Sequence, residues 1–471
     1  MRIAMVASEA APLVKTGGLG DVMQALPLEL SRLRGNEIVM FLPYYKRIKE
    51  NKELSVEEIG SFTMDLAWRE SYVGIFRLKT RRKKLQIYFI DNDYYFGGRN
   101  TVYGDFDDGE RFAYYSKAVL AALYYLDFKP DVLHCHDWQA AMGVVYCKAL
   151  YQNWCPNTKT VFTIHNVEYQ GWAEGSFFDN VLGLPEEFRG AMTFDGAINL
   201  MKGAIQVADM VTTVSKTYSK ELCYPQYAHR LDDMLRNCRL TGITNGIDTD
   251  VYNPETDKAL CAPYSGKDLS GKAENKRALQ RELGLNEDPN VPIFAMVTRL
   301  AGHKGIDLLC YIANRMLERP VQLVIVGTGE KQYEYGLSAL ARQRMGQVAV
   351  CLRFDPALAS RVYAGADFYL MPSKSEPCGL SQLIAMRYGT IPVVSATGGL
   401  RDTVLPYGEV GGRGFVFYDY NGEAFMDAID RGLALYYDDK AGFEALVKAD
   451  MSVDFSWRVP AEEYMQLYRE L

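Results

Sequence analysis

The sequence lacks the features of a membrane or disulfide-stabilised protein. No stretch of about 20 apolar residues occurs in the 471 residues, and no apolar leader precedes the first predicted strand at residues 2–8. Nine cysteines are scattered without a C-x-x-C pair, which indicates free thiols in a reducing compartment. These absences predict a cytoplasmic protein without a membrane contact.

An excess of positive charge is also missing. The formal net charge is −7, which argues against a nucleic-acid surface. Hydrophobic residues make up 48% and charged residues 24%, which is typical of a globular chain. Because 471 residues exceed one typical core, two or three domains are expected.

What the sequence does contain is a repeated alternation of short apolar runs and helical patterns. Residues 60–91 alone differ, because they predict a β-hairpin over a basic turn at residues 81–84. The alternation predicts an α/β protein with two doubly wound parallel sheets. Buried strands are expected within residues 2–8, 37–43, 131–142, 160–171, 207–222, 291–309, 321–330, 348–354, 366–372 and 391–395.

Domain boundaries follow from composition. Residues 242–254 are rich in Asn, Gly, Asp and Pro and show little periodicity, so they are expected to link two domains. We predict an N-terminal Rossmann-like domain at 1–243, a C-terminal one at 244–455, and a terminal helix at 456–471 that crosses back to the first domain.

The stretch from residue 371 to 400 concentrates the chemistry. Glu376 follows the predicted strand at 366–372, and the carboxyl ends of strands are where open α/β sheets bind ligands. A helix starting at Gly379 would offer free N–H groups as an anion site. A carboxylate beside such a site suits a sugar attached to a diphosphate. An ordinary solvated glutamate is the alternative that the residue types leave open.

Thr397, Gly398 and Gly399 follow the next strand and could bring bare backbone close to a ligand. Cys378 adjoins the predicted helix start, which would lower its thiol pKa and favour selective alkylation. A buried, inert thiol is the alternative.

Two positively charged residues follow an earlier predicted strand. Arg299 and Lys304 follow the strand within 291–309, and Lys304 is expected at a helix start. Both are expected in solvent-facing loops, where they could oppose a diphosphate. A surface Arg–Lys pair without a ligand is the alternative.

The first half carries three polar strand ends. Residues 15–21 form a glycine-rich turn into a helix, a geometry that can cradle phosphate but often serves only tight packing. His134 and His136 have strand spacing and should share one face, whereas Asp137 should face away and lie near a helix cap. No metal is expected there, because no further ligand set accompanies them. His165 ends the strand within 160–171, where a lone histidine is usually structural.

These segments together resemble one family. EPCGL at 376–380, QLIAMRYGTIPVV at 382–394 and TGGLRDTV at 397–404 are similar to the bacterial glycogen synthases and plant starch synthases. KTGGL at 15–19, HDW at 136–138, IHN at 164–166 and NGID at 245–248 extend the resemblance from about residue 2 to about 458. Ile384 stands where many other retaining transferases of this fold carry a second glutamate. Gln139 and the loop at 97–102 depart from the family pattern.

The resemblance implies a GT-B type fold, with two Rossmann-like domains facing a deep cleft that closes during the reaction. It implies transfer of glucose from ADP-glucose, or alternatively UDP-glucose, to the non-reducing end of an α-1,4-glucan such as glycogen or a maltooligosaccharide. The configuration is retained, and no cofactor or metal is implied. The catalytic residues implied are Glu376, His165, Asp137, Lys304 and Arg299. The donor-binding residues implied are Lys15, Gly17, Gly18, Asn245, Cys378, Gly379, Leu380, Ser381, Thr397 and Gly398.

Two other functions stay open on the sequence. One is a nucleotide-sugar glucosyltransferase with a small acceptor, and the other is a non-catalytic glucan-binding relative. The preferred mechanism lets the leaving phosphate remove the acceptor proton, and a covalent glycosyl–Glu376 intermediate is the alternative.

Overall fold

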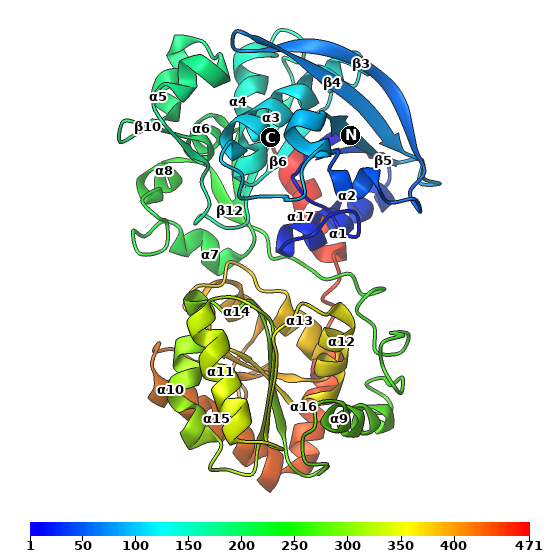
Figure 1. Ribbon diagram of the computed structural model, residues 1–471, viewed down its shortest axis with the longest axis vertical. Coiled ribbons are helices and arrows are strands. Elements are labelled where there is room, and N and C mark those ends of the chain that lie inside the picture. Colours follow the sequence, from blue (N-terminus) through cyan, green and yellow to red (C-terminus); the bar gives the residue numbers. More distant parts are fainter. The chain divides into compact units, whose positions relative to one another are not determined.

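The computed structural model describes residues 1–471 and divides into two compact units (Figure 1). The first unit comprises Met1–Asn245 and Trp457–Leu471, and the second comprises Gly246–Ser456. The chain passes into the second unit within the segment 242–254 and returns after Ser456. None of its helices combines the length and the apolar character that a membrane crossing needs.

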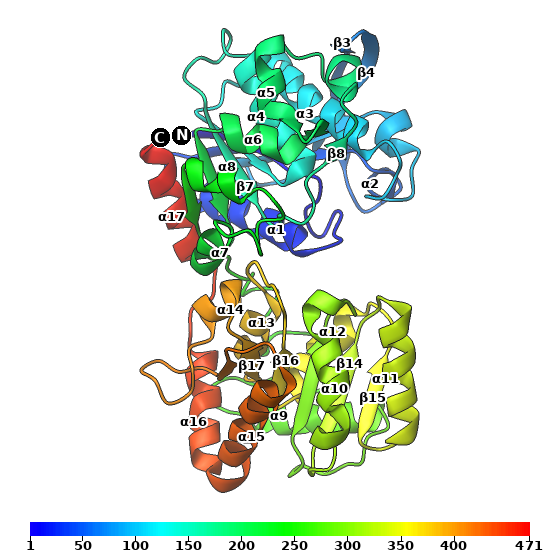
Figure 2. The ribbon, with the colours of Figure 1, turned by 90° about the vertical axis from the view of Figure 1, so that its left-hand side faces the viewer.

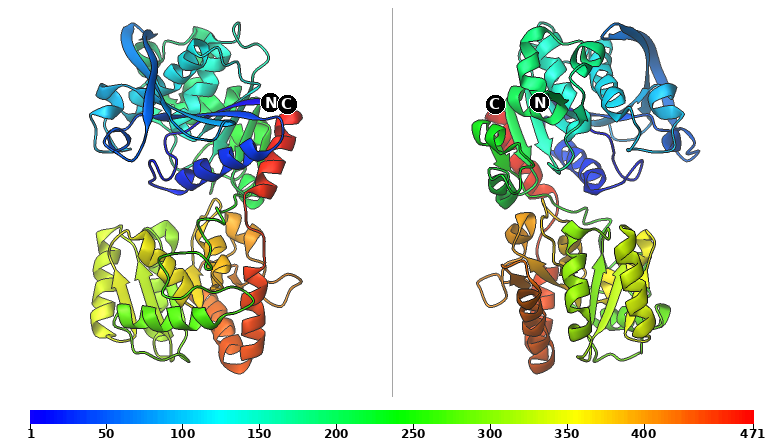
Figure 3. Two further views of the ribbon diagram at one scale, coloured as in Figure 1. Left: turned by 90° about the vertical axis from the view of Figure 1, so that its right-hand side faces the viewer. Right: turned by 60° about the vertical axis from the view of Figure 1, so that its left-hand side comes forward.

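The first unit is built on a nine-stranded sheet. Seven strands are parallel, and two antiparallel strands form one edge, where Figure 3 shows them as a long hairpin. The order is β12 (Leu240–Gly242), β11 (Met210–Thr213), β7 (Lys159–Ile164), β6 (Val132–His136), β1 (Arg2–Val6), β2 (Glu37–Pro43), β5 (Leu85–Asp91), β4 (Arg69–Leu78) and β3 (Val56–Leu66). The predicted hairpin is confirmed by the antiparallel pairing of β4 with β5, whereas β3 was not predicted as a separate strand.

Helices cover this sheet. The C-terminal α17 (Arg458–Arg469) packs beside α1 (Gly18–Arg32) within the first unit, as Figure 2 shows. Ser215 caps α7 (Lys216–Glu221), because its hydroxyl accepts the N–H of Tyr218. The other elements of this unit are α2 (Lys46–Lys49), α3 (Asp108–Tyr125), α4 (Trp138–Leu150), α5 (Arg189–Met192), α6 (Leu200–Val207), α7 (Lys216–Glu221), α8 (Asp232–Asn237) and a small sheet of β8 (Trp172–Ala173), β10 (Ala197–Asn199) and β9 (Thr193–Phe194).

The second unit holds a six-stranded, entirely parallel sheet. Its strands read as apolar runs because both faces are covered by helices. The order is β15 (Val348–Cys351), β14 (Gln322–Val326), β13 (Ile293–Val297), β16 (Phe368–Met371), β17 (Ile391–Ser395) and β18 (Phe415–Phe417). The helices are α9 (Ser270–Glu282), α10 (Ile306–Met316), α11 (Lys331–Gln343), α12 (Pro356–Gly365), α13 (Ser381–Arg387), α14 (Gly398–Thr403), α15 (Gly422–Asp438) and α16 (Lys440–Met451).

Strand order gives each sheet a point where the direction of winding reverses. In the first unit the chain adds β2 and β5 on one side of β1, and then begins the other side with β6. In the second unit β14 and β15 lie on one side of β13, and β16 begins the other. Ligands of doubly wound folds bind beyond the carboxyl ends of the two strands at such a point. Both units therefore confirm the expected α/β class and mark one end of each sheet.

Candidate active site

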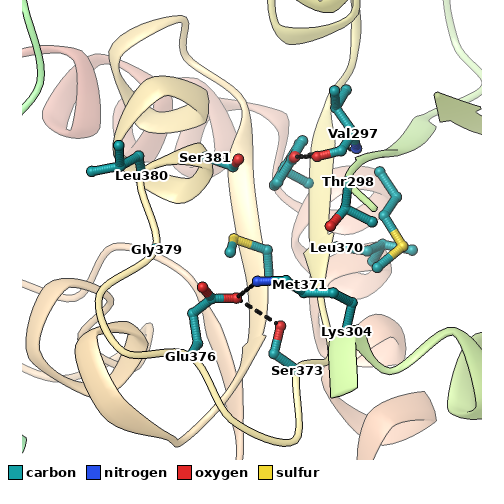
Figure 4. Close-up of a pocket in the computed structure, with 12 residues that line it drawn as sticks. Val297, Thr298, Lys304, Leu370, Met371, Ser373, Glu376, Gly379, Leu380 and Ser381 are labelled. Atoms are coloured by element: carbon teal, nitrogen blue, oxygen red, sulfur yellow. Dashed lines mark hydrogen bonds and ion pairs between the residues drawn. The ribbon is translucent and has the colours of Figure 1, made fainter. Parts of the chain in front are cut away.

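A pocket lies at the reversal point of the second unit. It begins where β13 and β16 end (Figure 4). Every lining residue belongs to the second unit. They are Met296, Val297, Thr298, Lys304, Tyr369, Leu370, Met371, Ser373, Glu376, Gly379, Leu380 and Ser381.

Glu376 is buried in this pocket, with a relative exposure of 6%. Its Oε2 accepts a hydrogen bond from Nζ of Lys304 at 2.8 Å and another from the hydroxyl of Ser373 at 3.0 Å (Figure 4). A buried carboxylate needs such partners, because an unpaired charge is costly in an apolar interior. The alternative of an ordinary solvated glutamate is therefore wrong. Ser373 was not predicted.

The two cations differ in their surroundings. Arg299 is exposed and forms no ion pair, as expected for a solvent-facing loop. Lys304 is only partly exposed, so the same expectation is wrong for it. It ends a short 3₁₀ turn, Gly302–Lys304, and Gly305 after it has a φ of +75°. A Cβ on Gly305 would lie 1.9 Å from the carbonyl oxygen of Pro372, so glycine is what lets this turn approach the end of β16.

The helix after Glu376 begins later than predicted. Helix α13 starts at Ser381, and Gly379 has a left-handed φ of +73°. The side chain of Gln382 holds this turn by donating to the carbonyls of Cys378 (3.1 Å) and Gly379 (2.9 Å). Gly379 therefore belongs to the turn, and its N–H is not part of a helix start. A glycine that the sequence pattern read as helical is in fact the residue that lets the chain turn.

The glycines after β17 serve packing within the protein. The N–H of Gly399 donates to the carbonyl of Glu376 at 3.0 Å. A Cβ on Gly398 would lie 1.9 Å from that same oxygen, and one on Gly399 would lie 2.4 Å from Cα of Cys378. We expected these glycines to bring the backbone close to a ligand. The structure instead shows them close to the backbone of residues 376–378. Cys378 is buried at 4% exposure, so the inert-thiol alternative fits it better than a reactive one.

The glycine-rich loop of the first unit folds around a carboxylate of its own. Glu9, just after β1, is buried and accepts the N–H groups of Thr16 and Gly17, the latter at 3.3 Å, and the hydroxyl of Thr16 at 2.9 Å. These donors are thus not free to cradle a phosphate, which corrects that interpretation. Burial raises the pKa of Glu9. Lys15, on the same loop, is ion-paired with Asp21 at 2.6 Å. Glu9 was not predicted, although an acidic residue directly after a buried strand is the signal that could have found it.

Asp137 occupies the N-cap position of α4 but does not cap that helix. Its Oδ1 instead accepts the backbone N–H groups of His165 at 2.7 Å and Asn166 at 3.4 Å. Its φ of +58° and ψ of 176° cost a non-glycine residue about 1–3 kcal/mol, and such strain concentrates at functional sites. Burial raises the pKa of Asp137 to about 7. The structure thus brings Asp137 and His165 together at the ends of β6 and β7.

Three histidines lie in a row at these strand ends. His134 and His136 share one face of β6 as predicted, with ring centroids 4.0 Å apart. Nδ1 of His136 lies 3.0 Å from Nε2 of His165. Burial lowers the pKa of all three rings, to about 3 for His134 and His165, so all are neutral at pH 7. Asn245, which ends the first stretch of this unit, is buried, and its Oδ1 has no hydrogen-bond partner.

Comparisons with known proteins decide the family. Residues 2–237 match the model for the starch synthase catalytic domain, and residues 275–441 match the one for glycosyl transferases group 1. The chain belongs to the glycogen and starch synthase family. A glycogen synthase from Clostridium botulinum (strain Alaska E43 / Type E3) is 44% identical over 488 residues, which span 100% of this chain and 99% of that protein. One from Exiguobacterium sibiricum is 44% identical over 480 residues, with the same two coverages.

A solved structure agrees over the whole chain. The catalytic domain of starch synthase IV from Arabidopsis thaliana, bound to ADP and acarbose, is 34% identical with a TM-score of 0.92. The alignment covers 99% of this chain and 98% of that one. The predicted family, the GT-B type fold and the activity are confirmed: the chain is a retaining glucosyltransferase of the glycogen synthase type. Membership implies a nucleotide-sugar donor and a glucan acceptor.

Proposed function

We propose that the chain transfers glucose from ADP-glucose to the non-reducing end of an α-1,4-glucan, glycogen or a maltooligosaccharide. The observation that carries the proposal is the buried pair of Glu376 and Lys304 in the pocket beyond the carboxyl ends of β13 and β16. The Arabidopsis starch synthase was solved with ADP, which favours ADP-glucose over UDP-glucose as the donor. The same complex contains acarbose, which favours a glucan-like acceptor.

The donor's diphosphate is assigned to the second unit. Arg299 is exposed and unpaired, so its guanidinium can take a phosphate without breaking an existing contact. Lys304 is held by Glu376, so its ammonium can be shared between that carboxylate and a phosphate. Each charge-assisted hydrogen bond contributes about 1.5–3 kcal/mol. The further donor contacts are assigned to Asn245, Cys378, Gly379, Leu380, Ser381 and Thr397.

The transferred glucose is assigned to both Glu376 and residues of the first unit. Glu376 accepts sugar hydroxyl protons and keeps Lys304 in place. Lys15, Asp137 and His165 supply contacts to the sugar, and Gly17 and Gly18 leave room beside Lys15. Asp137 acts largely by holding the loop that carries His165, since its carboxylate binds that backbone.

Retention of configuration follows if the acceptor attacks from the face that the leaving group departs from. The bond between the anomeric carbon and the phosphate oxygen breaks, and the electron pair goes to the phosphate. The acceptor hydroxyl then bonds to the anomeric carbon, and the departing phosphate takes its proton. Arg299 and Lys304 stabilise the charge that develops on that phosphate. A covalent intermediate on Glu376 is the second mechanism.

Incubation with radiolabelled ADP-glucose, with and without glycogen, tests the function. Label in polymer that depends on glycogen supports the proposal. A small labelled product would indicate a transferase with a small acceptor, and no transfer would indicate a non-catalytic glucan-binding protein. Competition by unlabelled UDP-glucose then decides between the two donors.

A further inference from the structure

His136 has no role in the reaction as described so far, yet its ring is hydrogen-bonded to the imidazole of His165. Its Nδ1 lies 3.0 Å from Nε2 of His165, and the ring centroids are 5.3 Å apart. Asp137 holds the backbone of His165, not its ring. The orientation and the tautomer of the His165 ring therefore depend on His136.

Only one proton can lie between the two rings. Because both imidazoles are neutral at pH 7, each carries a single N–H. If His165 donated from Nε2, His136 would have to carry its own proton on Nε2. If His136 donates from Nδ1, its Nε2 is a bare acceptor and His165 carries its proton on Nδ1.

The surroundings of His136 favour the second arrangement. Nε2 of His136 is buried and has no hydrogen-bond partner. The first arrangement would leave a buried N–H without an acceptor, which is rarer in proteins than an under-satisfied acceptor. His136 is also fixed from its other side, because its ring packs against the tilted ring of His134, which is bonded to Tyr468 at 2.7 Å and Thr163 at 2.6 Å.

We infer that His136 is a positioning residue that donates from Nδ1 to Nε2 of His165 and thereby fixes the His165 proton on Nδ1. No protein group bonds Nδ1 of His165, and the residue as a whole is partly exposed. That nitrogen is then a neutral donor for a hydroxyl or ring oxygen of the transferred glucose. This inference rests on the proposed contact between His165 and the sugar.

A matched pair of substitutions tests it. In His136→Asn the amide nitrogen can take the place of Nδ1 and still donate. His136→Asp has nearly the same shape, but its ionised carboxylate can only accept, so His165 must donate from Nε2 and loses its Nδ1 donor or becomes charged. Both variants lose the same packing on His134. We expect kcat of His136→Asp to fall at least tenfold below that of His136→Asn, with KM for the donor changed less than kcat. Equal kcat values in the two folded variants would overturn the inference.

The unmodified enzyme provides a second readout that needs no variant. With only five histidines, ¹⁵N-histidine labelling and His165→Ala as the assignment control resolve the His165 ring. We expect a protonated Nδ1 and a bare Nε2 in the wild type and in His136→Asn. A wild-type ring protonated on Nε2 would overturn the inference even if neither variant folds. His165→Ala with wild-type turnover would instead remove the proposed role of His165 itself.

Discussion

At the scale of single residues, the site of the second unit depends on one buried ion pair. Glu376 and Lys304 each compensate the charge of the other, so neither can be read as an isolated functional group. The pair also explains how a strong cation can be kept near the proposed diphosphate site before the donor binds. A substitution at either position therefore has two effects, one on chemistry and one on the partner that remains.

Glu376→Gln separates the charge of this residue from its shape. We expect kcat to fall by roughly 10²–10⁴-fold, as for loss of a preorganised electrostatic group. Affinity for ADP should change little, because the proposed diphosphate contacts, Arg299 and Lys304, remain in place. Steady-state kinetics and an ADP titration measure the two quantities. An unchanged kcat would contradict the catalytic role, and a mass gain of one hexose on wild-type Glu376, with donor but no acceptor, would favour the covalent mechanism.

Arg299→Ala and Lys304→Ala form a matched pair for the diphosphate. Each should lower the rate by about 10²-fold, since each removes a charge-assisted hydrogen bond. Only Lys304→Ala should also lower the free energy of unfolding, by roughly 1–3 kcal/mol, because it leaves the Glu376 carboxylate buried and unpaired. The 20% exposure of the Lys304 side chain keeps this loss below that of a fully buried pair. Chemical denaturation of both variants measures it, and equal stabilities would show that the pair contributes nothing to folding.

Gly17 offers a test of ligand approach in the first unit. A Cβ there would meet its nearest neighbour, Glu9, only at 3.8 Å, and its φ of −151° suits any residue. Gly17→Ala should therefore leave the thermal midpoint unchanged yet lower kcat/KM at least tenfold if glucose approaches this backbone. Gly399→Ala is the contrasting control, since its Cβ would clash with Cys378 and should destabilise the second unit. Wild-type activity in Gly17→Ala would remove Gly17 from the donor-binding set.

Residue chemistry alone drew attention to Glu376 and Lys304, because a charged group just after an apolar strand is conspicuous in the sequence. A role for Asp137 followed only from the family resemblance. The bonding partners of these residues could not be predicted from the sequence. Lys304 and Glu376 are 72 residues apart, and only the folded sheet brings β13 and β16 together. Glu9 was not predicted for a different reason. Its partners, Thr16 and Gly17, belong to a glycine-rich loop whose N–H groups are interpreted from the sequence as a possible phosphate site.

At the scale of elements, most parallel strands were predictable because burial on both faces makes them continuous apolar runs. The short edge strands β12 and β18 were not predicted. Strand β3 was missed because four of its eleven residues are exposed and its apolar alternation is interrupted. The order of strands in each sheet cannot be read from the chain, so the reversal points that locate the site came from the structure alone. The start of α13 was placed two residues early because Gly379 continues the helical spacing but turns left-handed.

Helix α16 contains a carboxyl group that makes stability depend on pH. Asp450 is fully buried, neither of its oxygens has a hydrogen-bond partner, and burial raises its pKa to about 8. The unfolded pKa is about 3.9, so between pH 4 and 8 the folded state binds a proton that the unfolded state does not. The stabilisation of the folded state by this bound proton is thus fully present below pH 4 and is lost as pH rises through 8.

Asp450→Asn should remove this dependence, because the amide stays neutral. We expect the wild-type thermal midpoint of the second unit to fall between pH 5.5 and 8.5 by more than that of the variant. Calorimetry at several pH values measures the difference. Parallel pH curves for the two proteins would show that Asp450 does not bind a proton in the folded state.

At the scale of the whole molecule, the two units are built differently along the chain. The second unit is one continuous segment with its own core, including Phe294, Phe368 and Ile391. The first unit needs both ends of the chain, since α17 buries Tyr464 and Tyr468 against it. A helix that crosses back was expected from the sequence, but its contact with His134 was not.

This asymmetry predicts the behaviour of fragments. A fragment of residues 246–456 should fold on its own, since its sheet is complete and every residue lining the pocket is retained. It should bind ADP within about tenfold of the full chain, because most of the proposed diphosphate contacts lie within it, but it should transfer no glucose.

A fragment of residues 1–245 should be unstable, because loss of α17 exposes the apolar surface of α1. Adding a peptide of residues 457–471 should restore part of its stability.

Isothermal titration of the 246–456 fragment with ADP, using its Arg299→Ala variant as the control, measures the binding. A folded 246–456 fragment that does not bind ADP would contradict the assignment of the diphosphate to the second unit, because the donor would then require residues that only the first unit supplies.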